Sequence, residues 1–180
     1  MITCRRASIA LAASILILAI PRSASAQVEI EVDPLAFALD GFSLNVGTVF
    51  GQLRASVGTF GIDVPHSLHR RDGFDMTMRG AGLKVDWLGK DAWGWFAGAD
   101  ASYYRNSYVA HDLRQTSQRE EYVFGVRGGY RLPIGRSGLY LAPWVGVGFN
   151  FPEGDIHFNG KTFENRAITV LPALHIGWRF

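Results

Sequence analysis

Apolar and polar residues alternate with a period of two along much of the chain, most clearly in the last segment, 165–180. Its apolar residues fall on one face and are Ile168, Val170, Leu174, Ile176, Trp178 and Phe180. Successive residues of a β-strand point to opposite faces, so this segment is predicted to be a strand with one apolar face. The same pattern predicts eight strands, at about 28–39, 42–50, 53–62, 74–88, 94–109, 120–134, 138–151 and 165–180.

Two segments break this alternation. In the first, acidic residues share a parity with the apolar residues that follow them, so we expect the barrel strand proper to begin near Pro34. Near Gly80–Gly82 the parity slips, which predicts a β-bulge, a feature in which glycine is common.

The predicted connections differ in length on the two sides of the sheet. Three are short, at 51–52, 89–93 and 135–138, whereas three that alternate with them are longer and more polar, at 63–73, 110–119 and 152–164. Asp40-Gly41 is a favoured two-residue hairpin turn between the first two strands. Short turns on one side and long loops on the other are typical of bacterial outer-membrane barrels. The fold class predicted is all-β, an eight-stranded antiparallel transmembrane β-barrel.

The N-terminal segment 1–26 has the layout of a cleavable signal peptide. Arg5 and Arg6 precede an apolar run over 7–20, and Ala24 and Ala26 form an Ala-x-Ala cleavage site. The alternative is a membrane anchor, but this run is shorter than the roughly 20 residues that a spanning helix needs. The domain division predicted is 1–26 signal peptide and 27–180 barrel.

Removal of the signal peptide changes the net charge and the cysteine content of the chain. The chain has 18 basic and 16 acidic residues, and the signal holds three arginines and no acid, which leaves 15 basic against 16 acidic. No nucleic-acid footprint remains. The only cysteine, Cys4, lies in the signal, so the mature chain forms no disulfide.

Charged residues on the non-apolar faces are expected to fill the barrel interior, because eight strands leave room for little more than side chains. Both signs are present, which favours ion pairs over a wide channel. Arg79 and Lys84, next to the parity slip, are also predicted to face inward. The predicted lumen charge network is Arg54, Asp86, Asp100, Glu121, Arg127, Arg131, His175 and Arg179.

Taken together, the chain resembles the small eight-stranded outer-membrane proteins, similar to the OmpA transmembrane domain and the OmpX-type barrels. The resemblance is architectural and covers 27–180, and its most specific part is the alternating C-terminal segment ending in an aromatic residue. In such proteins this end is the signal that the barrel assembly machinery recognises. The resemblance therefore implies an assembly signal at Leu174, Ile176, Trp178 and Phe180, and a bacterial outer-membrane location.

No enzymatic or metal-binding motif stands out. Small barrels that modify lipid A or phospholipids are the enzymatic alternative, but no nucleophile–base pair emerges, since Gly177 stands two residues after His175 where a hydroxyl would be needed. His66, His69, His111 and His157 fall in outer loops without fixed further ligands. We expect no cofactor, no metal and no catalytic residue.

Three other interpretations concern the lumen and the loops. A narrow ion-conducting pore and a secreted lipocalin-like barrel remain alternatives to a structural or surface-interaction role. The outer loops carry mixed charge, with Arg70 and Arg71 in one of them, which fits lipopolysaccharide phosphates or an extracellular partner. Outer-membrane lipid, lipopolysaccharide and the barrel assembly machinery are the expected partners of a monomer.

Overall fold

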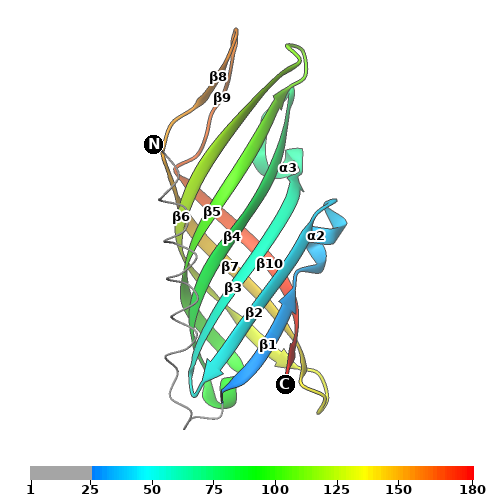
Figure 1. The fold of residues 1–180 in the computed structure, drawn as a ribbon, viewed down its shortest axis with the longest axis vertical. Helices are drawn as coiled ribbons and strands as arrows, with labels where there is room; N and C mark the ends of the chain where they lie inside the picture. The colour runs from blue at the N-terminus through cyan, green and yellow to red at the C-terminus, as the bar shows by residue number, and fades with distance from the viewer. Residues whose placement is uncertain (1–25) are drawn as a thin grey trace, which may run out of the picture.

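The computed structural model describes residues 26–180, which form a closed antiparallel barrel (Figure 1). Its strands are β1 (Gln27–Val32), β2 (Phe42–Phe50), β3 (Leu53–Val64), β4 (Phe74–Leu88), β5 (Gly94–Ala110), β6 (Gln115–Pro133), β7 (Leu139–Phe151) and β10 (Ile168–Arg179). Sequential neighbours pair, and β1 closes the ring between β10 and β2. The prediction of eight antiparallel strands in a ring is confirmed. Residues 1–25, which hold the predicted signal peptide except Ala26, lie outside the described residues.

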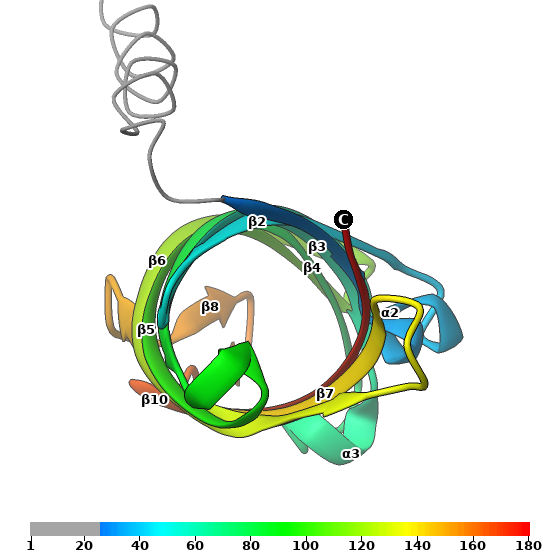
Figure 2. The same ribbon diagram turned by 90° about the horizontal axis from the view of Figure 1, so that it is seen from below.

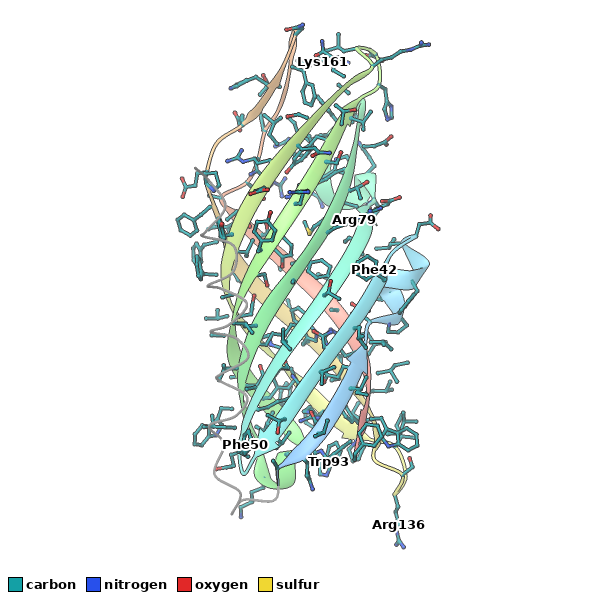
Figure 3. The ribbon with its side chains drawn as sticks, in the orientation of Figure 1. Phe42, Phe50, Arg79, Trp93, Arg136 and Lys161 are labelled. Atoms are coloured by element: carbon teal, nitrogen blue, oxygen red, sulfur yellow. The ribbon has the colours of Figure 1, made fainter. Side chains whose placement is uncertain are left out.

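The two ends of the barrel differ. The turn end carries the short connections and the C-terminus, and the loop end carries the longer loops, with Arg136 and Lys161 marking the opposite extremes (Figure 3). At the turn end, η1 (Lys90–Ala92) lies within the ring as seen from below (Figure 2). At the loop end, α3 (His66–His69) follows β3, and a hairpin of β8 (Ile156–Phe158) and β9 (Lys161–Phe163) separates β7 from β10.

The connection between β1 and β2 corrects two predictions. The strand does not begin near Pro34: β1 ends at Val32, and α2 (Pro34–Ala38) follows. Asp33 caps this helix by accepting a hydrogen bond from the Leu35 amide at 2.9 Å, and proline at the first helical position suits its start. The two strands are consequently joined by the whole of 33–41 rather than by a two-residue turn at Asp40-Gly41.

Strand β4 and its neighbours also differ from the predicted structure. Its register with β3 and β5 runs without interruption, so the bulge near Gly80–Gly82 is absent. Arg79 was predicted to face inward but points outward, whereas Lys84 points into the barrel as predicted. The prediction of a loop at 110–119 is also wrong. Strands β5 and β6 remain paired as far as Ala110 and Gln115, which leaves only 111–114 between them.

The apparent bulge in the sequence comes from a reversal of sidedness along β4. Toward the turn end, apolar Val85 and Trp87 face outward and Asp86 inward, as in a membrane barrel. Toward the loop end, Met76 and Met78 face inward while Asp75 and Arg79 face outward. The apolar residues thus change faces without any break in the strand, which produces an apparent slip in the sequence.

The loop end has its own apolar core. Ile156 and Phe163 of the hairpin are buried against Phe74 of β4 and Tyr108 of β5. Phe163 lies 4.7 Å from Tyr108 and 5.5 Å from Phe74 between ring centroids. This packing holds the β8–β9 hairpin across the loop end of the barrel.

Within residues 26–180, no helix has the length and apolar character needed to cross a membrane.

One glycine is required by close packing across the wall. Gly177 pairs with Tyr140 in the ladder, and a Cβ at Gly177 would lie 2.2 Å from the Tyr140 ring. We predict that Gly177→Ala lowers the free energy of unfolding by about 1–3 kcal/mol, the usual cost of overpacking. The matched control is Gly128→Ala, whose Cβ would meet its nearest neighbour at 3.5 Å. Urea unfolding in detergent micelles measures both, and equal effects would contradict the packing described.

Candidate functional site

The most concentrated polar chemistry of the described chain lies inside the barrel toward the turn end. Inward-facing side chains from six strands meet there, since alternate residues of each strand point into the lumen. We call this set the charge network: Glu29, Glu31, Arg54, Asp86, Arg127, Arg131, Tyr140, His175 and Arg179.

Glu29 on β1 is the acceptor for three arginines. Arg54 Nε donates to its Oε2 at 2.8 Å, and Oε1 accepts from Arg131 Nη2 at 2.6 Å and from Arg179 Nε at 2.7 Å. The carboxylate is fully buried, so these contacts replace the water that it loses on folding. One glutamate thereby joins β1 to β3, β6 and β10.

Arg54 on β3 is the matching cation. Besides Glu29 it contacts Glu31 Oε2 at 2.7 Å and Asp86 Oδ2 at 3.0 Å, so its guanidinium bridges three carboxylates. Asp86 in turn accepts two hydrogen bonds from Arg127, at 2.9 Å and 2.5 Å. Such two-point pairing of a planar guanidinium with a carboxylate is the strongest geometry available to an ion pair.

Glu31 has two further partners. The Tyr140 hydroxyl donates to its Oε1 at 2.8 Å, and His175 Nδ1 lies 3.0 Å from its Oε2. Since a carboxylate only accepts, the His175 proton belongs on Nδ1. The His175 ring also makes an edge-to-face contact with Trp144, with 5.6 Å between the ring centroids.

Aromatic rings complete the surroundings of the arginines. Arg131 lies over Tyr140 at 4.3 Å and Arg179 over Trp93 at 4.1 Å, measured from guanidinium carbon to ring centroid. Arg127 lies over Trp144 at 5.1 Å. Several buried N–H groups of Arg127 and Arg131 have no oxygen acceptor, and the π faces provide their electrostatic partner.

The charge network fills the lumen at its level. The void enclosed by Glu31, Arg54, Asp86, Arg127 and their neighbours measures about 10 Å³. A cavity needs at least about 10–15 Å³ to hold one water molecule. The void at this level is therefore about the size of a single water molecule.

The observed network differs from the predicted one in its acids. Arg54, Asp86, Arg127, Arg131, His175 and Arg179 all belong to it. Asp100 faces the lumen opposite Lys84, but no described residue forms an ion pair with it. Glu29 and Glu31 were missed because the first strand was expected to begin after them.

Glu121 lies in a separate polar cluster nearer the loop end. It accepts hydrogen bonds from Asn106 Nδ2 and Asn165 Nδ2, each at 3.0 Å, and lies 3.4 Å from Arg119 Nε. Asn165 comes from the connection after the β8–β9 hairpin, so this cluster ties that connection to the barrel wall. Its contacts are separate from those of the charge network, so it is a second site of buried charge.

The outer loops are linked by ion pairs rather than arranged around a metal. Arg71 contacts Glu164 at 2.7 Å, and Lys161 donates to Asp112, which lowers the pKa of that carboxyl below its ordinary value. His66 pairs with Asp72 at 2.7 Å. Residues 26–180 contain no group of three or more histidine, cysteine or acidic residues placed to hold a metal ion.

No protein-family model matches the sequence, and no curated protein matches it. The chain is similar in fold to the crystal structure of Neisserial surface protein A (NspA), with 14% identity over 86% of this chain and 92% of that one, and a TM-score of 0.48. A major outer membrane protein from Thermus thermophilus is 14% identical over 87% and 100%, with a TM-score of 0.47. The β domain of the Bordetella autotransporter BrkA is 11% identical over 86% and 98%, with a TM-score of 0.35.

Loss of one network acid tests whether the ion pairs stabilise the barrel. We predict that Glu29→Gln lowers the free energy of unfolding by about 3–5 kcal/mol, because the buried arginines lose a shared counter-charge. The control Glu120→Gln removes an acid of the exposed pair with Arg105 and should cost less than about 1 kcal/mol. Denaturant unfolding of both variants measures the difference. A Glu29→Gln cost as small as that of the control would contradict the proposed role of the network.

Proposed function

We propose that this chain is an integral outer-membrane β-barrel with a structural or surface-interaction role and a lumen closed by the charge network. The observation that carries the proposal is the apolar exterior of a closed barrel. Large apolar side chains such as Leu83, Val126 and Val170 are about 60% exposed on the outward face. An apolar surface of this extent is unfavourable in water and is expected where lipid surrounds the protein.

Aromatic residues bound this apolar band on β5 and β6. Trp95 and Tyr130 lie edge to face at 5.0 Å toward the turn end, and Tyr103 and Tyr122 lie 5.6 Å apart toward the loop end. Eight residues along each strand separate the two pairs, which corresponds to about 26 Å of strand. With the strand tilt usual in membrane barrels, this is about 20 Å along the membrane normal, close to the usual apolar band.

The exterior becomes charged beyond the second pair. Arg79, Arg105 and Glu120 are direct neighbours across β4, β5 and β6, and all three side chains are exposed. Cations just outside an aromatic girdle suit the phosphates of lipid headgroups. This supports lipopolysaccharide and outer-membrane lipid as partners, with the loop end outside the cell.

The remaining assignments follow from the sequence pattern. Residues 1–26 are proposed as a signal peptide cleaved after Ala26, with Ala24 outside the described residues. Leu174, Ile176 and Trp178 share the outward face of β10, and the Phe180 amide donates to the Val28 carbonyl at 2.9 Å. The proposed assembly signal would then lie at the seam where β10 meets β1.

The alternatives have less support. A pore needs a continuous water path, and the network void is about 10 Å³. A lipocalin-like barrel would place apolar residues inside and polar ones outside along its whole length, unlike the turn half here. For an enzyme, residues 26–180 offer no serine hydroxyl hydrogen-bonded to a histidine ring. We therefore propose a non-enzymatic role.

A charge placed in the middle of the apolar band tests membrane insertion. Val126 faces outward on β6 between Tyr122 and Tyr130. We predict that Val126→Arg lowers the unfolding free energy in lipid vesicles by about 2–4 kcal/mol, the cost of arginine near the bilayer midplane. The control is Gln118→Arg, on the same face of the same strand but beyond the charged row. Equal stability of the two variants in vesicles would overturn the proposed membrane position.

A further inference from the structure

The barrel wall is incomplete on one side. Strand β1 is six residues long and pairs with β10 only at residues 176–179. Residues 168–175 of β10 therefore have β7 on one side and no strand on the other, and residues 42–44 of β2 likewise lack a partner on the side of β1. We call the space between these two edges the wall opening.

Helix α2 lies at the wall opening, outside the ring of strands (Figures 1 and 2). It contacts β2, β3 and β10, and the Leu39 carbonyl accepts a hydrogen bond from the Asp63 amide at 3.0 Å. Leu35 and Phe37 of this segment have exposed side chains, whereas Ala36 is buried. The helix thus presents apolar side chains outward, like the strands beside it.

A cavity of about 360 Å³ lies behind this opening, in the half of the lumen toward the loop end. Most of its wall is apolar and includes Phe60, Met76, Met78, Tyr104, Val123 and Leu171. Its size is within the range of about 300–1,000 Å³ usual for small-molecule sites. Lys84 and Asp100 line the end of the cavity next to the charge network.

The charge network borders the cavity toward the turn end, where Trp144 lines both voids. Toward the loop end the lining includes the polar side chains of Glu121, Asn150 and Asn165. Leu35 of α2 and Pro172 of β10 also line the cavity, although Leu35 is exposed on the outer surface and Pro172 lies on the unpaired stretch of β10. The cavity therefore continues through the wall opening between α2 and β10.

The position of the wall opening relative to the apolar band indicates whether lipid or water reaches it. Ile168 and Val170 on the same stretch of β10 face outward and are 50% and 59% exposed, so this stretch belongs to the apolar band. Proline at 172 suits such a position, because prolines in strands are confined to places where no ladder donor is needed, edges above all. An apolar cavity that opens into the apolar band meets lipid chains rather than water.

We propose that this cavity binds one acyl chain of a membrane lipid, which enters from the bilayer through the wall opening. The headgroup stays outside, and the chain lies along Met78, Leu171 and their neighbours. This inference rests on the proposed membrane position of the barrel. It adds a ligand class and an entry route to a barrel whose lumen is filled by the charge network toward the turn end.

Trp144 provides a native reporter, because it lines the cavity while the other tryptophans do not. The experiment uses a variant in which Trp87, Trp93, Trp95 and Trp178 are replaced by phenylalanine, refolded in phosphatidylcholine vesicles that contain a phosphatidylcholine brominated on one acyl chain. We expect Trp144 emission to be quenched as strongly as that of a second variant that keeps Trp95 alone, whose side chain is exposed on the apolar exterior. Unquenched Trp144 beside quenched Trp95 would overturn the inference.

The same pair of variants separates the two proposals. If the Trp95 variant is itself unquenched, the membrane position fails, and the inference fails with it. A brominated free fatty acid added from water to unbrominated vesicles distinguishes the source of the chain. Quenching of Trp144 by the fatty acid and not by the brominated phospholipid would refute entry from the bilayer.

Blocking the opening tests the route. Ala173 faces inward on β10 at the opening and lines the cavity, whereas Val170 faces outward on the same strand. In the Trp144 reporter, Ala173→Phe is expected to abolish quenching by the brominated phospholipid, and Val170→Phe to leave it unchanged. Full quenching in a folded Ala173→Phe variant would contradict the proposed route. If Ala173→Phe does not fold, the comparison of Trp144 and Trp95 quenching in the variants that keep Ala173 still tests the inference.

Discussion

The barrel is closed by its shortest strand, and the two carboxylates of that strand tie it to the rest of the wall. Unpaired backbone donors and acceptors are costly in lipid, so the seam at β1 matters for the whole fold, and α2 contacts β2 and β10 where β1 stops. β1 offers only four ladder pairs to β10 and five to β2. Glu29 and Glu31 supplement them with ion pairs and hydrogen bonds to side chains of β3, β6, β7 and β10.

This arrangement explains why so much charge is buried in a small protein. Buried ion pairs often contribute little net stability, because desolvation offsets their attraction. Here they do something that apolar side chains cannot do as well: they connect strands that are not neighbours in the ring. Arg54 of β3 reaches β1 past β2, and Arg131 of β6 reaches β1 across the lumen. Closure of the lumen follows from the same contacts.

The short β1 has a second consequence at the loop end. Where β1 stops, α2 and the lumen cavity take the place of wall, and the apolar residues of β4 change from the outer to the inner face. The barrel therefore consists of two halves that distribute apolar and charged residues differently between the inner and outer faces. The turn half is apolar outside and charged inside, whereas the loop half has a mostly apolar interior around the Glu121 cluster and, on β4 to β6, a charged exterior.

Period-two alternation predicted most of the fold because it holds wherever one face meets lipid. The bounds of β2 and β4 match the prediction, and Val85 and Val126 lie on the face expected. The pattern failed where sidedness reverses, at Met76 and Arg79, and where Pro34 begins a helix instead of a strand. The charge network was predicted by parity alone, which identifies what faces inward but not which side chains reach one another.

The missed acids left a detectable signal. The predicted lumen set holds four arginines with Asp86, Asp100 and Glu121 as their acids, and Asp100 and Glu121 lie too far along their strands to join the network. A search for inward acids elsewhere would have found Glu29 and Glu31, which alternate with Val28, Ile30 and Val32. No sequence pattern indicated the wall opening, because it depends on the length of one strand relative to its neighbours.

Conductance across a planar lipid bilayer tests the central claim most directly. A barrel closed by the charge network is predicted to insert without producing steady current at any moderate voltage, with heat-modified gel migration showing that the inserted protein is folded. Stable single-channel current steps from the folded wild-type protein would contradict the account, because they require a water path where Glu29, Arg54 and Asp86 meet.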